Sequence, residues 1–140
     1  MVRISDEELV KILLENARKP YVEIARSLKV TEAAVRKRIK KLEERGIIRR
    51  YTIDIDPRKL GYEAQVFIGV DAAPEHYVKV MNDMKAMEEV IELYSTSGDH
   101  MFIAECWLRS ARELADFVER LERLEGVTRV CPAIVLEKVK

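Results

Sequence analysis

Residues 20–46, PYVEIARSLKVTEAAVRKRIKKLEERG, limit the possible folds of this chain more than any other stretch. Two short helical periods separated by a few turn residues predict two helices that pack across a tight turn. In the second helix, Val35, Ile39 and Leu42 recur at helical spacing and form one apolar face. The same stretch carries the basic residues Arg36, Lys37, Arg38, Lys40, Lys41 and Arg45. A helix with a buried stripe and a cationic remainder suits the major groove of DNA.

Charge is divided between two parts of the chain, although its 140 residues are neutral overall with 25 basic and 25 acidic side chains. Residues 1–53 hold 14 Lys and Arg against 8 Asp and Glu, whereas residues 54–140 hold 11 against 17. An acidic surface is repelled by phosphates, so we expect only the first part to bind nucleic acid.

Several classes of protein are disfavoured by the composition. No apolar run approaches the roughly 20 residues of a membrane helix, and the charged N-terminus does not resemble a secretory signal, so we expect a cytoplasmic protein with no membrane partner. Cys106 and Cys131 are too few and too far apart for a metal site, and we interpret them as buried apolar residues. No catalytic Ser–His–Asp order or glycine-rich phosphate loop is present, which argues against an enzyme.

The first part of the chain predicts a helix-turn-helix domain over residues 1–53. We expect helices from Ser5 to near Asn16, over residues 21–28, and between Thr31 and Gly46. Residues 47–53 mix β-branched and basic side chains, which indicates a short strand or wing. Residues 54–63 contain Pro57 and Gly61 and are the natural linker.

The second part predicts a domain over residues 64–140. We expect strands at 65–70, 90–96, 101–108 and 127–139, with helices at 74–87 and from the capping box at Ser110 to Gly126. This βαββαβ order is the split-βαβ, ferredoxin-like plan, so the whole chain is of the α+β class.

The strand at 101–108 predicts an interface. One of its faces carries Ile103, Glu105 and Trp107, which is too apolar for free solvent. If both helices cover the other face of the sheet, a second subunit must cover this one. We therefore expect a homodimer formed sheet to sheet. Pro132 in the last strand suits an edge position.

The order of the elements resembles the Lrp/AsnC family of bacterial and archaeal transcription regulators. The resemblance is specific in ISDEELVKILLENAR, in EIARSLKVTEAAVRKRIKKLEERGIIRRYTIDIDPRKLGY, in STSGDHM and in EGVTRVCPAIVLEKVK, and it is closest to the archaeal LrpA type. It implies a winged helix-turn-helix domain joined to a RAM/ACT-like domain that senses amino acids. It also implies a homodimer that assembles further, which we expect to reach an octamer.

The helix-turn-helix match ranks the DNA contacts. It includes Thr31, Ala33, Ala34, Arg36, Lys37, Arg38, Lys40, Lys41, Arg49 and Arg50. Ala33, Ala34, Lys37 and Arg36 lie toward the start of the helix and are the expected base readers, and the remaining basic residues are expected to hold phosphates. Lys29 replaces the glycine usual in the turn, so some backbone strain is expected there.

The resemblance places an effector loop between the second and third strands. Here the loop consists of Thr96, Ser97, Gly98, Asp99, His100 and Met101. Gly98 allows close backbone approach, and Asp99 is suited to an ammonium group. Many effector-binding members have Tyr-Asp where this chain has His100-Met101, so the loop either binds an amino acid or serves assembly alone. No other cofactor is expected.

Two other functions are compatible with parts of this pattern. An octamer that wraps DNA with little sequence preference would be an architectural protein instead of a specific regulator. Sirohaem decarboxylases share the fold resemblance, but their tetrapyrrole would require basic or histidine side chains converging in the second domain. This chain has only His76 and His100, and its basic residues concentrate in the first domain. We therefore expect a sequence-specific DNA-binding regulator and not an enzyme.

Overall fold

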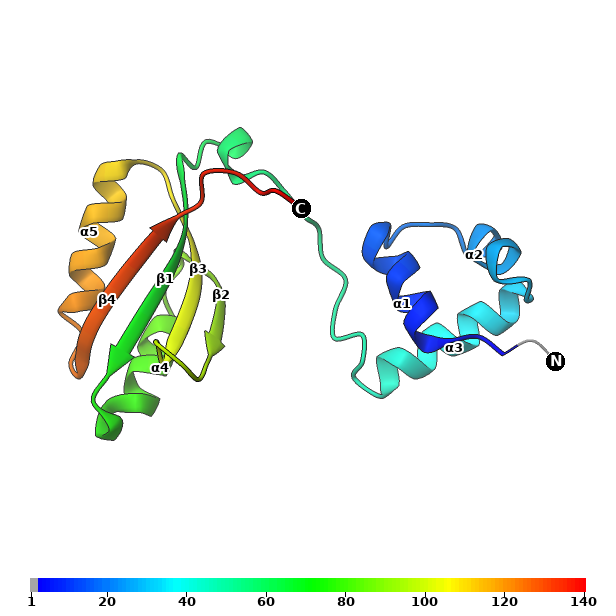
Figure 1. Ribbon diagram of the computed structural model, residues 1–140, viewed down its shortest axis with the longest axis horizontal. Helices are drawn as coiled ribbons and strands as arrows, with labels where there is room; N and C mark the ends of the chain where they lie inside the picture. The colour runs from blue at the N-terminus through cyan, green and yellow to red at the C-terminus, as the bar shows by residue number, and fades with distance from the viewer. Residues whose placement is uncertain (1–2) are drawn as a thin grey trace. The chain divides into compact units, whose positions relative to one another are not determined.

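The computed structural model describes residues 3–140, which form two compact units, one up to Asp54 and the other Ile55–Lys140 (Figure 1). Each unit has its own hydrophobic core. Within the described residues, no helix combines the length and apolar character needed to cross a membrane.

Three helices build the N-terminal unit: α1 (Asp6–Glu15), α2 (Tyr21–Leu28) and α3 (Glu32–Glu44). The Ser5 and Thr31 hydroxyl oxygens cap α1 and α3 by accepting the backbone N–H groups three residues later, which satisfies donors that have no partner within the helix. Their apolar faces meet in a core of Leu9, Leu13, Ile24, Ala25, Val35, Ile39 and Leu42. The predicted helix-turn-helix is confirmed.

The segment after α3 differs from the prediction. Gly46, with φ of 73°, ends the helix as expected, but residues 47–53 contain no strand. Their side chains are mostly exposed, Ile53 at 80%. A strand needs a neighbour to take its backbone hydrogen bonds, and the described residues of this single chain offer none here. The predicted strand is therefore wrong for this structure.

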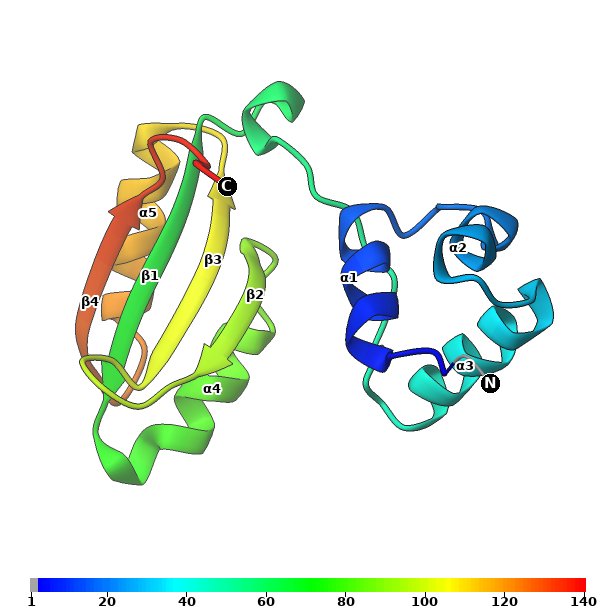
Figure 2. The same cartoon turned by 45° about the vertical axis from the view of Figure 1, so that its right-hand side comes forward.

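The C-terminal unit is a four-stranded antiparallel sheet with two helices on one face (Figure 2). Its elements are the 3-10 turn η1 (Pro57–Leu60), β1 (Ala64–Ala72), the 3-10 turn η2 (Pro74–His76), α4 (Tyr77–Lys85), β2 (Val90–Ser95), β3 (Phe102–Leu108), α5 (Ala111–Glu122) and β4 (Val127–Ile134). The strand order β2-β3-β1-β4 is that of a ferredoxin-like fold, which confirms the predicted fold class.

Two boundaries in this unit depart from prediction. The helix expected over residues 74–87 is divided into the 3-10 turn η2, with Pro74 at its start, and the α-helix α4, which ends at Lys85. The last strand ends at Ile134 rather than at Val139. Just after Ile134, the Arg58 side chain donates hydrogen bonds to the carbonyl oxygens of Val135 and Leu136. These two oxygens therefore bond to a side chain and not to a neighbouring strand. β4 is an edge strand, as Pro132 indicated.

Candidate nucleic-acid interface and effector loop

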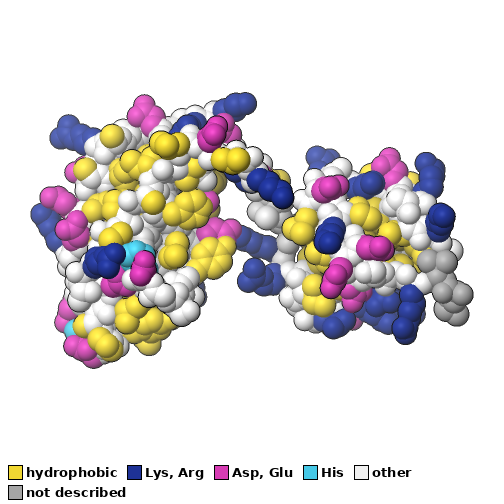
Figure 3. Space-filling view, in the orientation of Figure 1, with side chains coloured by type: hydrophobic (Ala, Val, Ile, Leu, Met, Phe, Trp, Pro, Cys, Tyr) yellow, Lys and Arg dark blue, Asp and Glu magenta, His cyan; other side chains and the backbone are white. Residues whose placement is uncertain are grey.

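The outer face of α3 is exposed and basic. With Val35, Ile39 and Leu42 buried, the side chains of Ala33, Lys37, Lys40 and Lys41 project into solvent. Lysine and arginine side chains gather along this helix in Figure 3. Arg49 and Arg50, in the irregular segment that follows, are also exposed. Cationic side chains on one exposed helix face can approach phosphates and base edges together.

Other predicted contacts on α3 are already engaged within the domain. The Thr31 hydroxyl oxygen accepts the N–H of Ala34, and Ala34 is itself partly buried. Arg38 turns toward α1, where its guanidinium pairs with Asp6 at 3.4 Å. The Thr31 cap is the one predicted from the sequence, whereas the pairing of Arg38 with Asp6 is a contact that helical periodicity could not reveal.

Arg36 lies beside the exposed face and has two supports. Its Nη2 donates to Glu32 Oε1 at 3.0 Å, and its guanidinium carbon lies 5.5 Å from the ring centroid of Tyr21. Neither of these two contacts was predicted from the sequence. The spacing of four residues between Glu32 and Arg36 is a recognisable ion-pair signal, whereas the contact with Tyr21 depends on how α2 crosses α3.

Lys29 occupies the turn between α2 and α3 in a left-handed conformation, with φ 56° and ψ 44°. It is the only described residue other than glycine with a positive φ. Its N–H still closes the helix end by bonding to the carbonyl oxygen of Arg26. The strain predicted from the missing glycine therefore has a structural basis, since a side chain in this region costs about 1–2 kcal/mol.

The substitution Lys29→Gly is expected to stabilise the N-terminal domain by about 1 kcal/mol. Removing the Cβ relieves the left-handed strain, and the greater freedom of glycine in the unfolded chain cancels part of the gain. The measurement is amide hydrogen exchange of the α3 core in the full chain. Lys29→Ala is the control, because it keeps the Cβ and should leave exchange nearly unchanged. Equal slowing by both variants would contradict the explanation.

The second candidate surface is the face of the sheet that the helices leave open. Phe102, Ala104, Cys106 and Leu108 of β3 are buried under the helices, and the alternate residues Ile103, Glu105 and Trp107 point to the open face. This alternation is as predicted. Phe67 from β1 and Tyr94 from β2 share the open face by register and are 41% and 50% exposed. Hydrophobic side chains cover much of this face in Figure 3.

The predicted effector loop folds back onto the open face and is fixed by Asp71 of β1. Asp71 Oδ2 lies 2.9 Å from His100 Nδ1, and Asp71 Oδ1 accepts the N–H of Met101 at 2.9 Å. The Thr96 hydroxyl donates to the carbonyl oxygen of His100 at 2.7 Å. The His100 ring covers Gly69, where a Cβ would come within 2.4 Å of it. Sequence reasoning did not identify Asp71 or Gly69.

The environment of Asp71 favours its charged form. Partial burial acts to raise the pKa of Asp71, but the hydrogen bonds from His100 and Met101 and the nearby charges of His100 and Arg129 outweigh burial and leave that pKa lowered. A lowered pKa means that this carboxylate contributes stability above its unfolded-state pKa and loses that contribution as pH falls through the folded value. The tip of the loop is open: Ser97, Gly98 and Asp99 are exposed, and nothing lies within 4 Å of a Cβ placed on Gly98.

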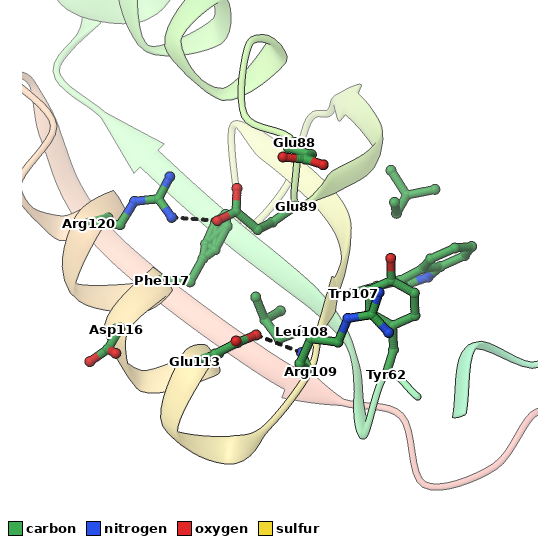
Figure 4. A pocket seen from close by; sticks show the side chains of 11 residues that line it. Tyr62, Glu88, Glu89, Trp107, Leu108, Arg109, Glu113, Asp116, Phe117 and Arg120 are labelled. Atoms are coloured by element: carbon green, nitrogen blue, oxygen red, sulfur yellow. Dashed lines mark hydrogen bonds and ion pairs between the residues drawn. The ribbon is translucent and has the colours of Figure 1, made fainter. Parts of the chain in front are cut away.

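A cavity of about 450 Å³ lies at the opposite end of β3 from this loop (Figure 4). Its lining side chains include Glu88, Glu89, Trp107, Arg109, Glu113, Asp116 and Arg120. Arg120 pairs with Glu89, and the carboxylate of Glu113 accepts the Arg109 N–H. Because carboxylates outnumber guanidinium groups here, the cavity is unsuited to the propionates of a tetrapyrrole. None of the predicted effector residues lines it.

The two cysteines differ in their surroundings. Cys106 is fully buried, and burial is the main reason that its pKa rises to about 12, which leaves it a neutral thiol. Cys131 lies on β4 and is partly exposed. Within residues 3–140, no three His, Cys, Asp or Glu side chains come together as a metal ion would require.

These features define a class: a helix-turn-helix protein with an exposed basic helix, joined to a ferredoxin-like domain. Residues 3–49 match the family model described as winged helix-turn-helix DNA-binding, and residues 65–140 match the Lrp/AsnC ligand binding domain. The chain belongs to the Lrp/AsnC family of transcription regulators.

Similarity to individual proteins extends over the whole length. The HTH-type transcriptional regulator LrpA of Pyrococcus horikoshii is 48% identical, with all of both chains covered. The structure of Escherichia coli AsnC matches with a TM-score of 0.81 at 25% identity, covering 99% of this chain and 96% of that one. A feast or famine regulatory protein from M. tuberculosis, complexed with L-methionine, matches with a TM-score of 0.81 at 26% identity. The match covers 96% of this chain and 92% of that one. The predicted archaeal type of DNA-binding regulator, rather than an enzyme, is confirmed by these relatives.

Proposed function

We propose that this chain is a cytoplasmic homodimer that binds specific duplex DNA through α3 and responds to an amino acid at the loop of residues 96–101. The observation that carries the proposal is the exposed basic face of α3, which lies on a helix whose opposite face builds the domain core. Of the predicted base readers, Ala33, Arg36 and Lys37 are exposed at the start of this helix. Lys40, Lys41, Arg49 and Arg50 are proposed to hold phosphates.

The open face of the sheet supports the proposed dimer. Ile103 and Trp107 lie on it with Phe67 and Tyr94, which makes a large apolar surface for a free monomer. Glu105 also lies there, and its carboxylate accepts from the Gln65 amide at 3.2 Å, so its charge is already partly satisfied. The octamer expected from the family resemblance remains a prediction, and the mass of the assembly by light scattering would test it.

Two observations support an amino-acid effector at the loop. Asp99 is exposed beside Gly98, whose lack of a side chain leaves the backbone accessible to a small ligand. A structurally similar protein was crystallised with L-methionine. Asp71 and His100 hold the base of the loop, so a ligand at its tip would meet a fixed backbone.

The test is a footprint on the DNA upstream of the chain's own coding region, repeated with each of the twenty amino acids. Specific protection that one amino acid shifts would support both parts of the proposal. Protection unaffected by all twenty would contradict the effector and leave a regulator that responds to its own concentration. Protection over many helical turns with little sequence preference would favour the architectural alternative.

Lys41→Ala is expected to weaken binding to specific and random DNA equally. A phosphate contact carries no sequence information, and its loss should reduce the slope of log affinity against log salt by about 0.9 for each subunit in contact. The measurement is the dissociation constant over a range of salt concentrations. Lys11→Ala, at an exposed position of α1, is the control and should change neither the affinity nor the slope. A selective loss of specific binding by Lys41→Ala would assign it to base reading.

A further inference from the structure

We propose that Tyr21 and Glu32 hold the guanidinium of Arg36 in position to read a guanine in the major groove. Arg36 would then determine specificity, and Tyr21 and Glu32 would be its positioning residues. This inference rests on the DNA binding proposed above, and it adds the base that is read and the side chains that prepare its reader.

Two different elements fix Arg36. Glu32 lies one turn earlier on α3 and accepts from Nη2 at 3.0 Å. Tyr21 begins α2, and its ring lies 5.5 Å from the guanidinium carbon. The arginine and glutamate side chains are still 64% and 48% exposed. The guanidinium is therefore restrained at the surface without being buried.

Stability alone does not account for this arrangement, because exposed ion pairs contribute little to folding. The restraint on the Arg36 side chain matters more for binding to DNA than for folding. A long side chain that is already ordered loses less conformational freedom when it meets its partner. The carboxylate of Glu32 would otherwise face phosphates unpaired, and its contact with Arg36 neutralises it.

The geometry also leaves the guanidinium competent to recognise a base. Among the residues that the structure describes, Glu32 is the one acceptor that contacts Arg36 through a hydrogen bond, and an arginine has five N–H donors. The remaining donors can form the paired hydrogen bonds to O6 and N7 that distinguish guanine. Arg36 lies in the first half of α3, the part of a recognition helix that reaches base edges.

The neighbouring side chains are less suited to this role. Ala33 offers only a methyl group, and the Thr31 oxygen already accepts a backbone N–H. Lys37 is exposed, but an ammonium is a mobile point charge without the planar fork of arginine. Of these candidates, Arg36 alone has a planar guanidinium that neighbouring side chains hold in one orientation.

The experiment begins by selecting binding sites from a pool of DNA duplexes with a randomised centre. Dissociation constants are then measured at one salt concentration for the selected duplex and for its single-base substitutions. Arg36→Lys keeps the charge and loses the fork, so the preference for guanine at one position of each half-site should fall about tenfold, within the range of a paired contact. Its affinity for random DNA should stay nearly unchanged.

The positioning residues Glu32 and Tyr21 are tested by measuring the base preference at the same position of the DNA half-site. Glu32→Gln should lower the guanine preference about two- to fivefold, while the lost negative charge raises affinity for all DNA. Glu44→Gln removes a carboxylate at the far end of α3 and is the matched control: it should raise affinity without altering base preference. Tyr21→Phe keeps the ring and should preserve the guanine preference, whereas Tyr21→Leu keeps an apolar side chain against the domain core and should reduce the preference.

The outcomes separate this inference from the function on which it rests. If the wild-type chain selects no sequence from the pool, the proposed specific DNA binding fails. If the wild type selects a site and Arg36→Lys retains every base preference, only the role of Arg36 is overturned. Identical behaviour of Glu32→Gln and Glu44→Gln would remove Glu32 as a positioning residue.

Discussion

Trp107→Asp is expected to convert the proposed homodimer into monomers. The substitution places an unpaired carboxylate on the open face that forms the proposed interface, and a buried charge without a partner costs about 3–5 kcal/mol. At tenfold per 1.4 kcal/mol, the dimer dissociation constant should rise by at least about a hundredfold. Light scattering at micromolar concentration measures the result as a halved mass.

Two further variants make this expectation specific. The Tyr62 ring lies 5.5 Å from the Trp107 ring, so Trp107→Asp also removes a contact within the subunit. Ile103→Asp tests the same face away from that aromatic contact and should dissociate the dimer as well. Val78→Asp is the control, because Val78 is exposed on α4 in the helical layer. An unchanged mass for both Trp107→Asp and Ile103→Asp would refute the sheet-to-sheet interface.

Gly69→Ala is expected to destabilise the C-terminal domain by about 1–3 kcal/mol, the usual cost of overpacking. The added Cβ would lie 2.4 Å from the His100 ring. The ring must therefore move, and its contact with Asp71 breaks as it does. The free energy of unfolding is measured in guanidinium chloride through Trp107 fluorescence, at one fixed protein concentration because a dimer gains stability with concentration.

A double-mutant cycle identifies the cause. In the His100→Ala background the space above Gly69 is free, so Gly69→Ala should have almost no cost there. The same loss of stability in both backgrounds would place the strain elsewhere. If the loop senses an amino acid, Gly69→Ala should also alter the response, because the loop leaves the position that Asp71 gives it.

The helices and strands could be predicted from sequence because their signals are local. The α1 and α3 caps at Ser5 and Thr31 act over three residues. The alternation along β3 follows from the strand geometry itself. The same local signals located the basic face of α3, since Val35, Ile39 and Leu42 fix which side is buried. Local signals failed at residues 47–53, where β-branched side chains favour a strand but no other part of residues 3–140 pairs with it.

The order of helices and strands, the exposed cationic helix and the apolar strand face could all be inferred from the sequence, because each shows as a pattern among residues within a few positions of one another. Which side chains are held in place depends on contacts between elements, and these appear in the folded structure alone. Asp71 meets His100 across 29 positions of sequence, and Tyr21 meets Arg36 only because α2 crosses α3. Periodicity carries no information about such distant contacts, since they depend on how whole elements pack.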